Sequence, residues 1–229
     1  MTKAPRPPAG SVVLLSGGMD SATCLALASR RDPPVHALTV LYGQRHEREL
    51  RSAQALARHF GAVSHVVLKL PIGPLLDSAL THRRVPLPRR PRKDGRIPPT
   101  YVPARNTILL ALALGVAESR GARAIYLGAN AIDYSGYPDC RPEFLRAFDA
   151  LARRATRVGV EDGWAPKIRA PLLRLTKRGV VELGERLGVP WALTWSCYAG
   201  GRRVCGVCDA CRWRAKGFRA AGIRDPLLG

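Results

Sequence analysis

The stretch that decides the fold is Val12-Val13-Leu14-Leu15-Ser16-Gly17-Gly18-Met19-Asp20-Ser21-Ala22-Thr23-Cys24-Leu25. Its four leading apolar residues predict a buried strand, and the Ser-Gly-Gly turn leads into a helix that begins near Asp20. Glycines allow backbone conformations closed to other residues, so successive N–H groups can converge on one anion. The hydroxyls of Ser16 and Ser21 add donors, and the positive end of the helix favours negative charge. The stretch therefore predicts a phosphate-binding turn.

Two other phosphate motifs are excluded. The turn has no lysine, which a Walker A loop requires, and it lacks the Gly-x-Gly-x-x-Gly of a dinucleotide site. The remaining alternative is an ordinary tight turn between a strand and a helix. The full Ser-Gly-Gly-x-Asp-Ser pattern after an apolar strand favours phosphate binding.

Strands and helices alternate through the rest of the chain. Further strands are expected at 35–41, 64–68, 124–127 and 167–173, and helices at 22–30, 47–60, 107–119, 143–155 and 176–187. This alternation is typical of an α/β fold with a Rossmann-like, doubly wound parallel sheet. We expect residues 1–190 to form that phosphate-binding domain and residues 191–229 to form a cysteine-rich C-terminal region.

Composition limits the compartment and the partners. With 37 Lys and Arg against 17 Asp and Glu, the net charge is +20, which favours phosphate-bearing partners. Aromatic content is 6%, without the basic-aromatic ladder that stacks single-stranded bases, so nucleic acid is not required. The longest apolar run, 108–117, is about half the length that crosses a bilayer. We expect a cytoplasmic protein without a membrane partner, and six cysteines in that reducing compartment favour metal or catalysis over disulfides.

Periodicity disappears between residues 81 and 99, where arginines alternate with prolines. A segment this long inside a compact domain is typical of a lid or of a disordered insertion. We expect a flexible flap over the nucleotide, with solvated disorder as the alternative.

Polar residues follow several predicted strands, where the ligand crevice of a parallel sheet lies. Gln44, Arg45 and His46 follow the second strand; a solvated loop with a helix cap is the alternative. The segment 128–141 combines carboxylates, an amide and tyrosines, a composition suited to a polar heteroaromatic ligand. A structural turn is the alternative there. The candidate binding residues in this segment are Asn130, Asp133, Tyr134, Tyr137 and Asp139.

Two cationic residues are candidates for contact with phosphate. Arg105, with Asn106, stands at the start of an apolar helix after a proline-rich segment, although Asn106 could equally be a helix cap. Lys177 lies in the first turn of a helix that Thr176 caps, and a surface lysine is the alternative.

The spacing Cys197-x7-Cys205-x2-Cys208-x2-Cys211 predicts a closed structural zinc site. Four thiolates on one short segment repel one another unless a cation holds them. An iron–sulfur cluster is the alternative. Cys24 and Cys140 lie outside this set, and we expect them to be small buried apolar residues.

The phosphate loop resembles that of the ATP pyrophosphatase (PP-loop) superfamily. Together with the other motifs, the sequence resembles the family of 7-cyano-7-deazaguanine synthases over nearly its whole length. The further matching stretches are 42–46, 101–106, 133–141, 171–172, 176–177 and 196–198 before the last three cysteines.

This resemblance implies an ATP-dependent ligase that converts 7-carboxy-7-deazaguanine and ammonia into a nitrile through adenylated carboxylate and amide intermediates. It implies a homodimer, with Mg²⁺ on the ATP and one structural Zn²⁺ per chain. The resemblance also implies catalytic roles for Asp20, Arg105 and Lys177. The ATP loop comprises Leu15, Ser16, Gly17, Gly18, Met19, Asp20, Ser21, Ala22, Thr23, Cys24 and Leu25.

Two rival functions remain open from the sequence. A PP-loop enzyme acting on tRNA would suit the basic charge, although no tRNA-binding extension is recognisable. A non-catalytic zinc-ribbon module for nucleic acid is the other rival. Release of AMP that depends on tRNA would favour the first, and failure to release pyrophosphate with any carboxylated base would favour the second.

Overall fold

The computed structural model describes residues 9–43, 48–82, 97–130, 137–199, 201 and 203–228. Within these ranges the strands are β1 (Ser11–Leu14), β2 (Val35–Leu41), β3 (Ser64–Lys69), β4 (Ala124–Tyr126) and β5 (Lys167–Arg169). The helices are α1 (Met19–Arg31), α2 (Arg48–His59), α3 (Arg105–Arg120), α4 (Pro142–Ala155), α5 (Arg157–Glu161), α6 (Lys177–Arg186) and α7 (Asp209–Ala221). Short 3-10 turns are η1 (Gly73–Leu75), η2 (Pro138–Cys140) and η3 (Trp191–Leu193).

The strands form one sheet in the order β3-β2-β1-β4-β5, and every neighbouring pair is parallel. The chain builds outward from β1 through β2 to β3 and then crosses to β4 on the other side of β1. This arrangement confirms the predicted doubly wound sheet. It also places the topological switch point, where such sheets bind ligands, at the carboxyl ends of β1 and β4.

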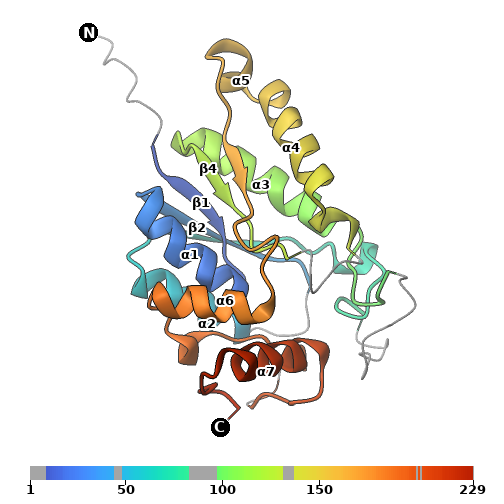
Figure 1. Ribbon diagram of the computed structural model, residues 1–229. Coiled ribbons are helices and arrows are strands. Elements are labelled where there is room, and N and C mark those ends of the chain that lie inside the picture. Colours follow the sequence, from blue (N-terminus) through green and yellow to red (C-terminus); the bar gives the residue numbers. More distant parts are fainter. Residues whose placement is uncertain are drawn as a thin grey trace.

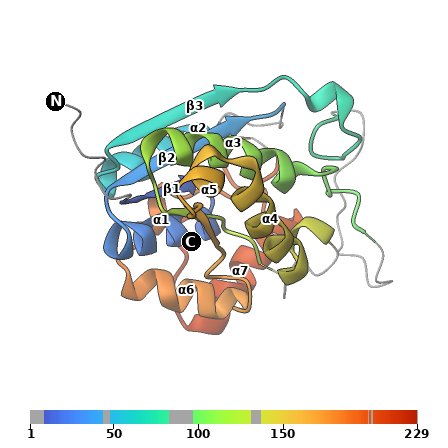
Figure 2. The ribbon, with the colours of Figure 1, turned by 90° about the horizontal axis from the view of Figure 1, so that it is seen from above.

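Helices cover both faces of the sheet, as Figures 1 and 2 show. Adjacent residues Val12 and Val13 of β1 are both fully buried, because successive strand side chains point to opposite faces. Val12 belongs to a core shared with α3 and α4, and Val13 to a core shared with α1, α2 and α6. The all-apolar strand at the centre of the sheet therefore has a packed layer on each side.

The C-terminal segment continues past α6 into η3 and α7, and α7 lies at the carboxyl end of the sheet beneath α6 (Figure 1). The two helices pack closely, since a Cβ added at Gly217 would stand 3.0 Å from the Cβ of Lys177. A buried ion pair fixes α7 to the end of the chain, with Arg214 Nε 2.7 Å from Asp225 Oδ2. The predicted domain boundary at residue 190 stays a prediction.

Some expected bounds differ from the structure. The last strand ends at Arg169 rather than residue 173, since Pro171 has no N–H to donate to a sheet. Helix α3 begins at Arg105, two residues before the expected start. Helices α5 and α7 were not expected. In the described part of the chain, none of the helices has both the length and the apolar character needed to cross a membrane.

Candidate active site and metal centre

A pocket of about 240 Å³ opens at the carboxyl ends of β1, β2 and β4. Its walls come from the phosphate loop, the ends of these strands, α3 and the C-terminal segment. Polar and aromatic residues that line it include Ser16, Asp20, Ser21, Thr39, Tyr42, Glu49, Arg105, Asn130, Tyr137, Lys177, Trp195 and Trp213. The structure thus brings three predicted cationic or acidic residues, Asp20, Arg105 and Lys177, to one pocket.

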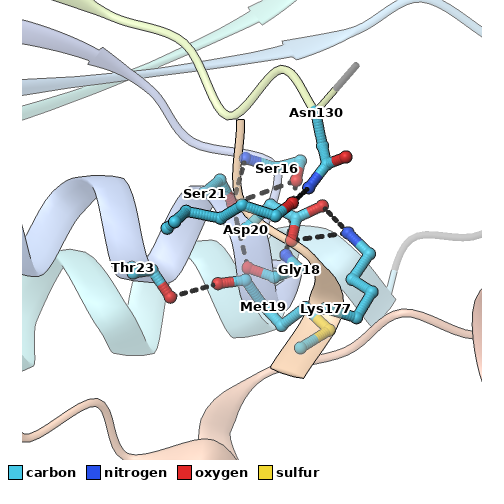
Figure 3. A network of polar contacts seen from close by, with 9 residues as sticks. Ser16, Gly18, Met19, Asp20, Ser21, Thr23, Asn130 and Lys177 are labelled. Atoms are coloured by element: carbon cyan, nitrogen blue, oxygen red, sulfur yellow. Dashed lines mark hydrogen bonds and ion pairs between the residues drawn. The ribbon is translucent and has the colours of Figure 1, made fainter. Parts of the chain in front are cut away.

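The phosphate loop is held in shape by its own hydroxyl groups (Figure 3). Ser21 Oγ accepts the backbone N–H of Ser16 at 3.2 Å and donates to the carbonyl of Gly18 at 3.1 Å. The backbone N–H of Gly18 donates to Ser16 Oγ at 3.3 Å. Gly17 has φ +89°, a conformation that favours glycine. These hydrogen bonds hold the loop in a compact turn at the N-terminal end of α1.

The later residues predicted for the ATP loop lie in the core. Ala22, Thr23, Cys24 and Leu25 are fully buried within α1 and do not line the pocket, and the Thr23 hydroxyl donates to the carbonyl of Met19 at 2.9 Å. Burial, and to a lesser degree Asp20, raises the pKa of the Cys24 thiol, which stays protonated. Cys24 and Cys140 are both buried free thiols, which confirms that expectation.

Asp20 and Lys177 form an ion pair in the pocket (Figure 3). Lys177 Nζ lies 2.8 Å from Asp20 Oδ1 and 2.6 Å from Oδ2. The lysine side chain is 3% exposed and the aspartate side chain 22%, so the alternative of a surface lysine is wrong. A loop residue and a residue 157 positions away thus meet where the negative charge of a triphosphate would be neutralised.

Asn130 lies beside this pair and is tied to the chain before α6. Its amide Nδ2 donates to the carbonyl of Leu175 at 2.6 Å. The loop after β4 also touches the phosphate loop, since a Cβ added at Gly128 would stand 3.2 Å from the backbone N of Ser21. The segment that carries Asn130 is therefore positioned by close backbone packing at the switch point.

Arg105 enters the pocket from the first position of α3. Burial lowers the pKa of Arg105, whereas its interactions with Tyr42 and Tyr137 raise it. The net pKa lies above the usual range, so the guanidinium stays charged. The preceding residue, Ala104, has φ +51°, an uncommon backbone conformation for a residue with a Cβ. This conformation lets α3 begin at Arg105 and places its charge in the pocket.

Asn106 and Asp139 bond to each other, and of the two Asn106 also lines the pocket. The backbone N–H of Asn106 donates to Asp139 Oδ2 at 2.9 Å, and the Asn106 side chain donates to the carbonyl of Asp139 at 3.0 Å. Asp139 is 5% exposed and does not line the pocket. Its carboxylate satisfies a backbone donor in the first turn of α3, next to Arg105. Tyr137 does line the pocket, and its hydroxyl lies 2.8 Å from Thr100 Oγ1.

Several pocket residues were missed by sequence reasoning. Glu49, in the first turn of α2, lines the pocket; its pKa is raised to about 8 by burial, with Arg105 acting in the opposite direction. The C-terminal segment adds Trp195, Ser196, Tyr198 and Trp213. Only Ser196 and Tyr198 stand in a motif quoted from the sequence. Nothing in local periodicity indicates that the cysteine-rich segment reaches back to the phosphate loop.

The four predicted cysteine ligands form one cluster. The Sγ atoms of Cys197, Cys205, Cys208 and Cys211 all lie within 4.8 Å of one another. A tetrahedron with Zn–S bonds of about 2.3 Å has edges of about 3.8 Å, and Cys205 Sγ lies 3.9 Å from Cys211 Sγ. Backbone N–H groups point at two sulfurs, from Cys205 to Cys197 at 3.3 Å and from Cys208 to Cys205 at 3.4 Å. The donor set therefore fits a single tetrahedral metal ion.

Five predicted ligand-binding residues lie outside the described part of the chain. They are Gln44, Arg45, His46, Asp133 and Tyr134. The middle of the expected flap, residues 83–96, also lies outside it. Their roles stay predictions.

The strand order and the glycine turn at the switch point define the class first: an α/β protein with the PP-loop fold. The structure of NMN synthetase from Francisella tularensis is similar, with a TM-score of 0.51, 19% identity, and coverage of 95% of this chain and 79% of that one. At this identity the likeness concerns the fold alone.

Sequence comparison then gives the family. A model of the family described as queuosine biosynthesis protein QueC matches residues 10–222, and this chain belongs to that family. A 7-cyano-7-deazaguanine synthase of Anaeromyxobacter sp. (strain Fw109-5) is 57% identical over 98% of each chain. The synthase of Aromatoleum aromaticum is 52% identical over 96% of this chain and 97% of its own.

Proposed function

We propose that this protein is an ATP-dependent ligase that converts 7-carboxy-7-deazaguanine and ammonia into 7-cyano-7-deazaguanine. The observation that carries the proposal is the 57% identity, over 98% of both chains, to a relative named for this product. The pocket supports it independently, because it joins a phosphate loop, a buried lysine and a partly buried arginine to a wall of aromatic and amide groups.

The chemistry requires activation of the carboxylate twice. A carboxylate is a poor electrophile, since its charge repels nucleophiles and oxide is a bad leaving group. Transfer of AMP from ATP to the carboxylate oxygen releases pyrophosphate and removes both obstacles. Ammonia then displaces AMP to give an amide. A second adenylation, on the amide oxygen, lets AMP leave as the nitrile forms, so two ATP yield two AMP and two pyrophosphates.

The protein's part is to position the reactants and neutralise charge. The glycine turn at the positive end of α1 suits the departing pyrophosphate. Lys177 and Arg105 are the cations that would compensate its negative charge as it leaves. Asp20 would hold Mg²⁺, which screens phosphate charge when it is bound, and would release Lys177 toward the nucleotide.

The pocket also suits a flat heterocycle. Asn130 and Tyr137 line it, and Trp213 adds aromatic surface from α7. We assign the reading of the deazaguanine edge to Asn130 and Tyr137, together with Asp133 and Tyr134. Asp139 would act indirectly, by holding the start of α3. Gln44, Arg45 and His46, which follow β2, stay candidates for the same ligand.

Three features of the proposal concern its setting. We propose that the four cysteines hold one structural Zn²⁺ per chain, which the spacing of their sulfur atoms suits. We propose a cytoplasmic location, because cysteines without disulfide bonds suit a reducing compartment. A homodimer is proposed on the family resemblance, and light scattering with known mass standards would test it.

A single assay tests the function. The protein is incubated with ATP, Mg²⁺, ammonium and 7-carboxy-7-deazaguanine, and products are measured by mass spectrometry. We expect the nitrile and two AMP per nitrile, with the amide as a transient species. Formation of ADP instead of AMP, or AMP release that requires tRNA, would contradict the proposal.

A further inference from the structure

Ser196 has an unsatisfied hydroxyl at the edge of the phosphate loop. Its Oγ is shielded from solvent, and among the described residues it has no hydrogen-bond partner. Buried hydroxyls are usually bonded, because leaving one unbonded costs about 1–3 kcal/mol. A hydroxyl left without a partner in the wall of a ligand pocket indicates that its partner is the ligand.

The position of this hydroxyl is set by the phosphate loop. Ser196 lines the pocket, and a Cβ added at Gly18 would stand 3.9 Å from its Oγ and 3.5 Å from Ser16 Oγ. Gly18 is the residue that precedes α1, so it stands at the positive end of that helix, which favours an anion. The Ser196 hydroxyl therefore lies beside Gly18, at the N-terminal end of α1, in the wall of the pocket.

The neighbours of Ser196 on both sides are fixed. The backbone N–H of Trp195 donates to the carbonyl of Gly17 at 2.8 Å, and the guanidinium of Arg48 lies 4.0 Å from the centre of the Trp195 ring. The Trp195 indole N–H donates to the carbonyl of Cys197 at 3.2 Å, and Cys197 belongs to the metal centre. Ser196 is therefore held rigidly against the loop by the cysteine segment.

We propose that the Ser196 hydroxyl is a further ligand of the ATP phosphates, supplied by the metal-binding segment rather than by the phosphate loop. It donates a hydrogen bond to a phosphate oxygen beside Gly18. This role rests on the proposed use of ATP, but it concerns binding and not turnover. The chain thereby closes the nucleotide site with a donor that lies 180 residues after Ser16.

The test compares Ser196→Ala with Ser196→Thr, which keeps a hydroxyl. The matched control is Ser29→Ala, since Ser29 Oγ in α1 is also buried and unbonded but lies outside the pocket. The probe is α,β-methylene-ATP with Mg²⁺, which the enzyme cannot cleave between the α and β phosphates, and its affinity is measured by calorimetry without the deazaguanine.

We expect Ser196→Ala to weaken probe binding about 10-fold to 100-fold, the effect of one hydrogen bond to a charged group. Ser196→Thr should stay within roughly threefold of the parent, and Ser29→Ala should bind normally. The ligand-free melting temperature of Ser196→Ala should be unchanged or higher, because an unbonded hydroxyl does not stabilise the fold.

Normal probe binding by Ser196→Ala would overturn the proposal. So would a lower ligand-free melting temperature or loss of metal in that variant, since either result makes the hydroxyl structural. Failure of the proposed function looks different: the parent protein would bind the probe, with the same dependence on Ser196, yet form no nitrile.

Discussion

At the scale of single residues, the ion pair of Asp20 and Lys177 explains how a lysine can be kept in the core of the nucleotide site. A buried ammonium requires a compensating charge, and here both carboxylate oxygens supply it, at 2.8 and 2.6 Å. The ion pair thus holds the lysine side chain in place within the pocket. Its partner Asp20 is the residue that we propose to hold Mg²⁺, and metal binding there would free Lys177 to face the phosphates.

We predict that Asp20→Asn reduces nitrile formation more than 100-fold and lowers the free energy of unfolding by about 3 kcal/mol. The physical reason for the second effect is that Lys177, 3% exposed, loses the carboxylate whose oxygens lie 2.8 and 2.6 Å from its Nζ. Product assays and denaturant unfolding of the ligand-free protein measure the two effects separately.

The double variant Asp20→Asn with Lys177→Met is the control, because it removes the buried ammonium together with its Asp20 partner while keeping the site disabled. It should recover most of the lost stability and none of the activity. Equal stability of the single variant and the parent would show that the pair does not stabilise the ligand-free fold.

The sequence predicted Asp20 and Lys177 as site residues, but not the burial of the lysine or the ion pair between them. Lys177 follows the capping residue Thr176, whose Oγ1 accepts the N–H of Gly179 at 3.3 Å, and that cap was predicted from residue types alone. Burial of the lysine depends on α7, which covers α6 from the far end of the chain. Asn106 shows the same limit: its partner Asp139 lies 33 residues away, and no local pattern indicates the contact.

At the scale of elements, the phosphate loop is packed between α1 and α2. A Cβ added at Gly17 would lie 2.3 Å from the carbonyl oxygen of Glu49 and 2.9 Å from the backbone N of Ala53. Glycine is therefore required at position 17 both by its φ of +89° and by the close approach of α2. The loop keeps its shape because a neighbouring helix leaves room for nothing larger.

We predict that Gly17→Ala lowers the free energy of unfolding by more than about 2 kcal/mol, since backbone atoms of α2 must move. Gly61→Ala is the matched control: Gly61 also has positive φ, +64°, but nothing lies within 4 Å of an added Cβ. That control should lose only about 1 kcal/mol. Thermal unfolding of both variants checks the difference, and equal losses would show that the contact with α2 is not tight.

The elements themselves were largely predictable, because alternating strands and amphipathic helices carry their own patterns. All five strands and the helices α1, α2, α3, α4 and α6 lie where the sequence placed them, within a few residues at each end. Helix α7 was missed because its first turn carries Cys211 of the metal set and its outer face is rich in arginine. Its inner face, with Arg214 and Phe218, is recognisable only after α6 and Asp225 are seen against it.

At the scale of the whole molecule, the metal centre and the nucleotide site are structurally connected. Trp195 bonds Gly17 through its backbone N–H and Cys197 through its indole, so one residue connects the phosphate loop to the cysteine cluster. The sequence predicted both sites and gave no sign of the connection. The metal is therefore expected to affect nucleotide binding, although it lies outside the proposed chemistry.

We predict that removing the metal weakens binding of α,β-methylene-ATP at least about tenfold. Without a cation the four thiolates repel one another, the segment from Cys197 to Cys211 loosens, and the Trp195 bond to Gly17 is released. The measurements are metal content, probe affinity and tryptophan fluorescence, to which Trp191, Trp195 and Trp213 contribute from this region. Far-ultraviolet circular dichroism should change little, since the sheet and its covering helices have their own cores.

Cys205→Ser should reproduce the loss of probe affinity, whereas Cys24→Ala, which alters a buried cysteine outside the cluster, should keep both metal and affinity. Metal-free protein that binds the probe as tightly as the parent would separate the two sites and leave the cysteine cluster a purely local support.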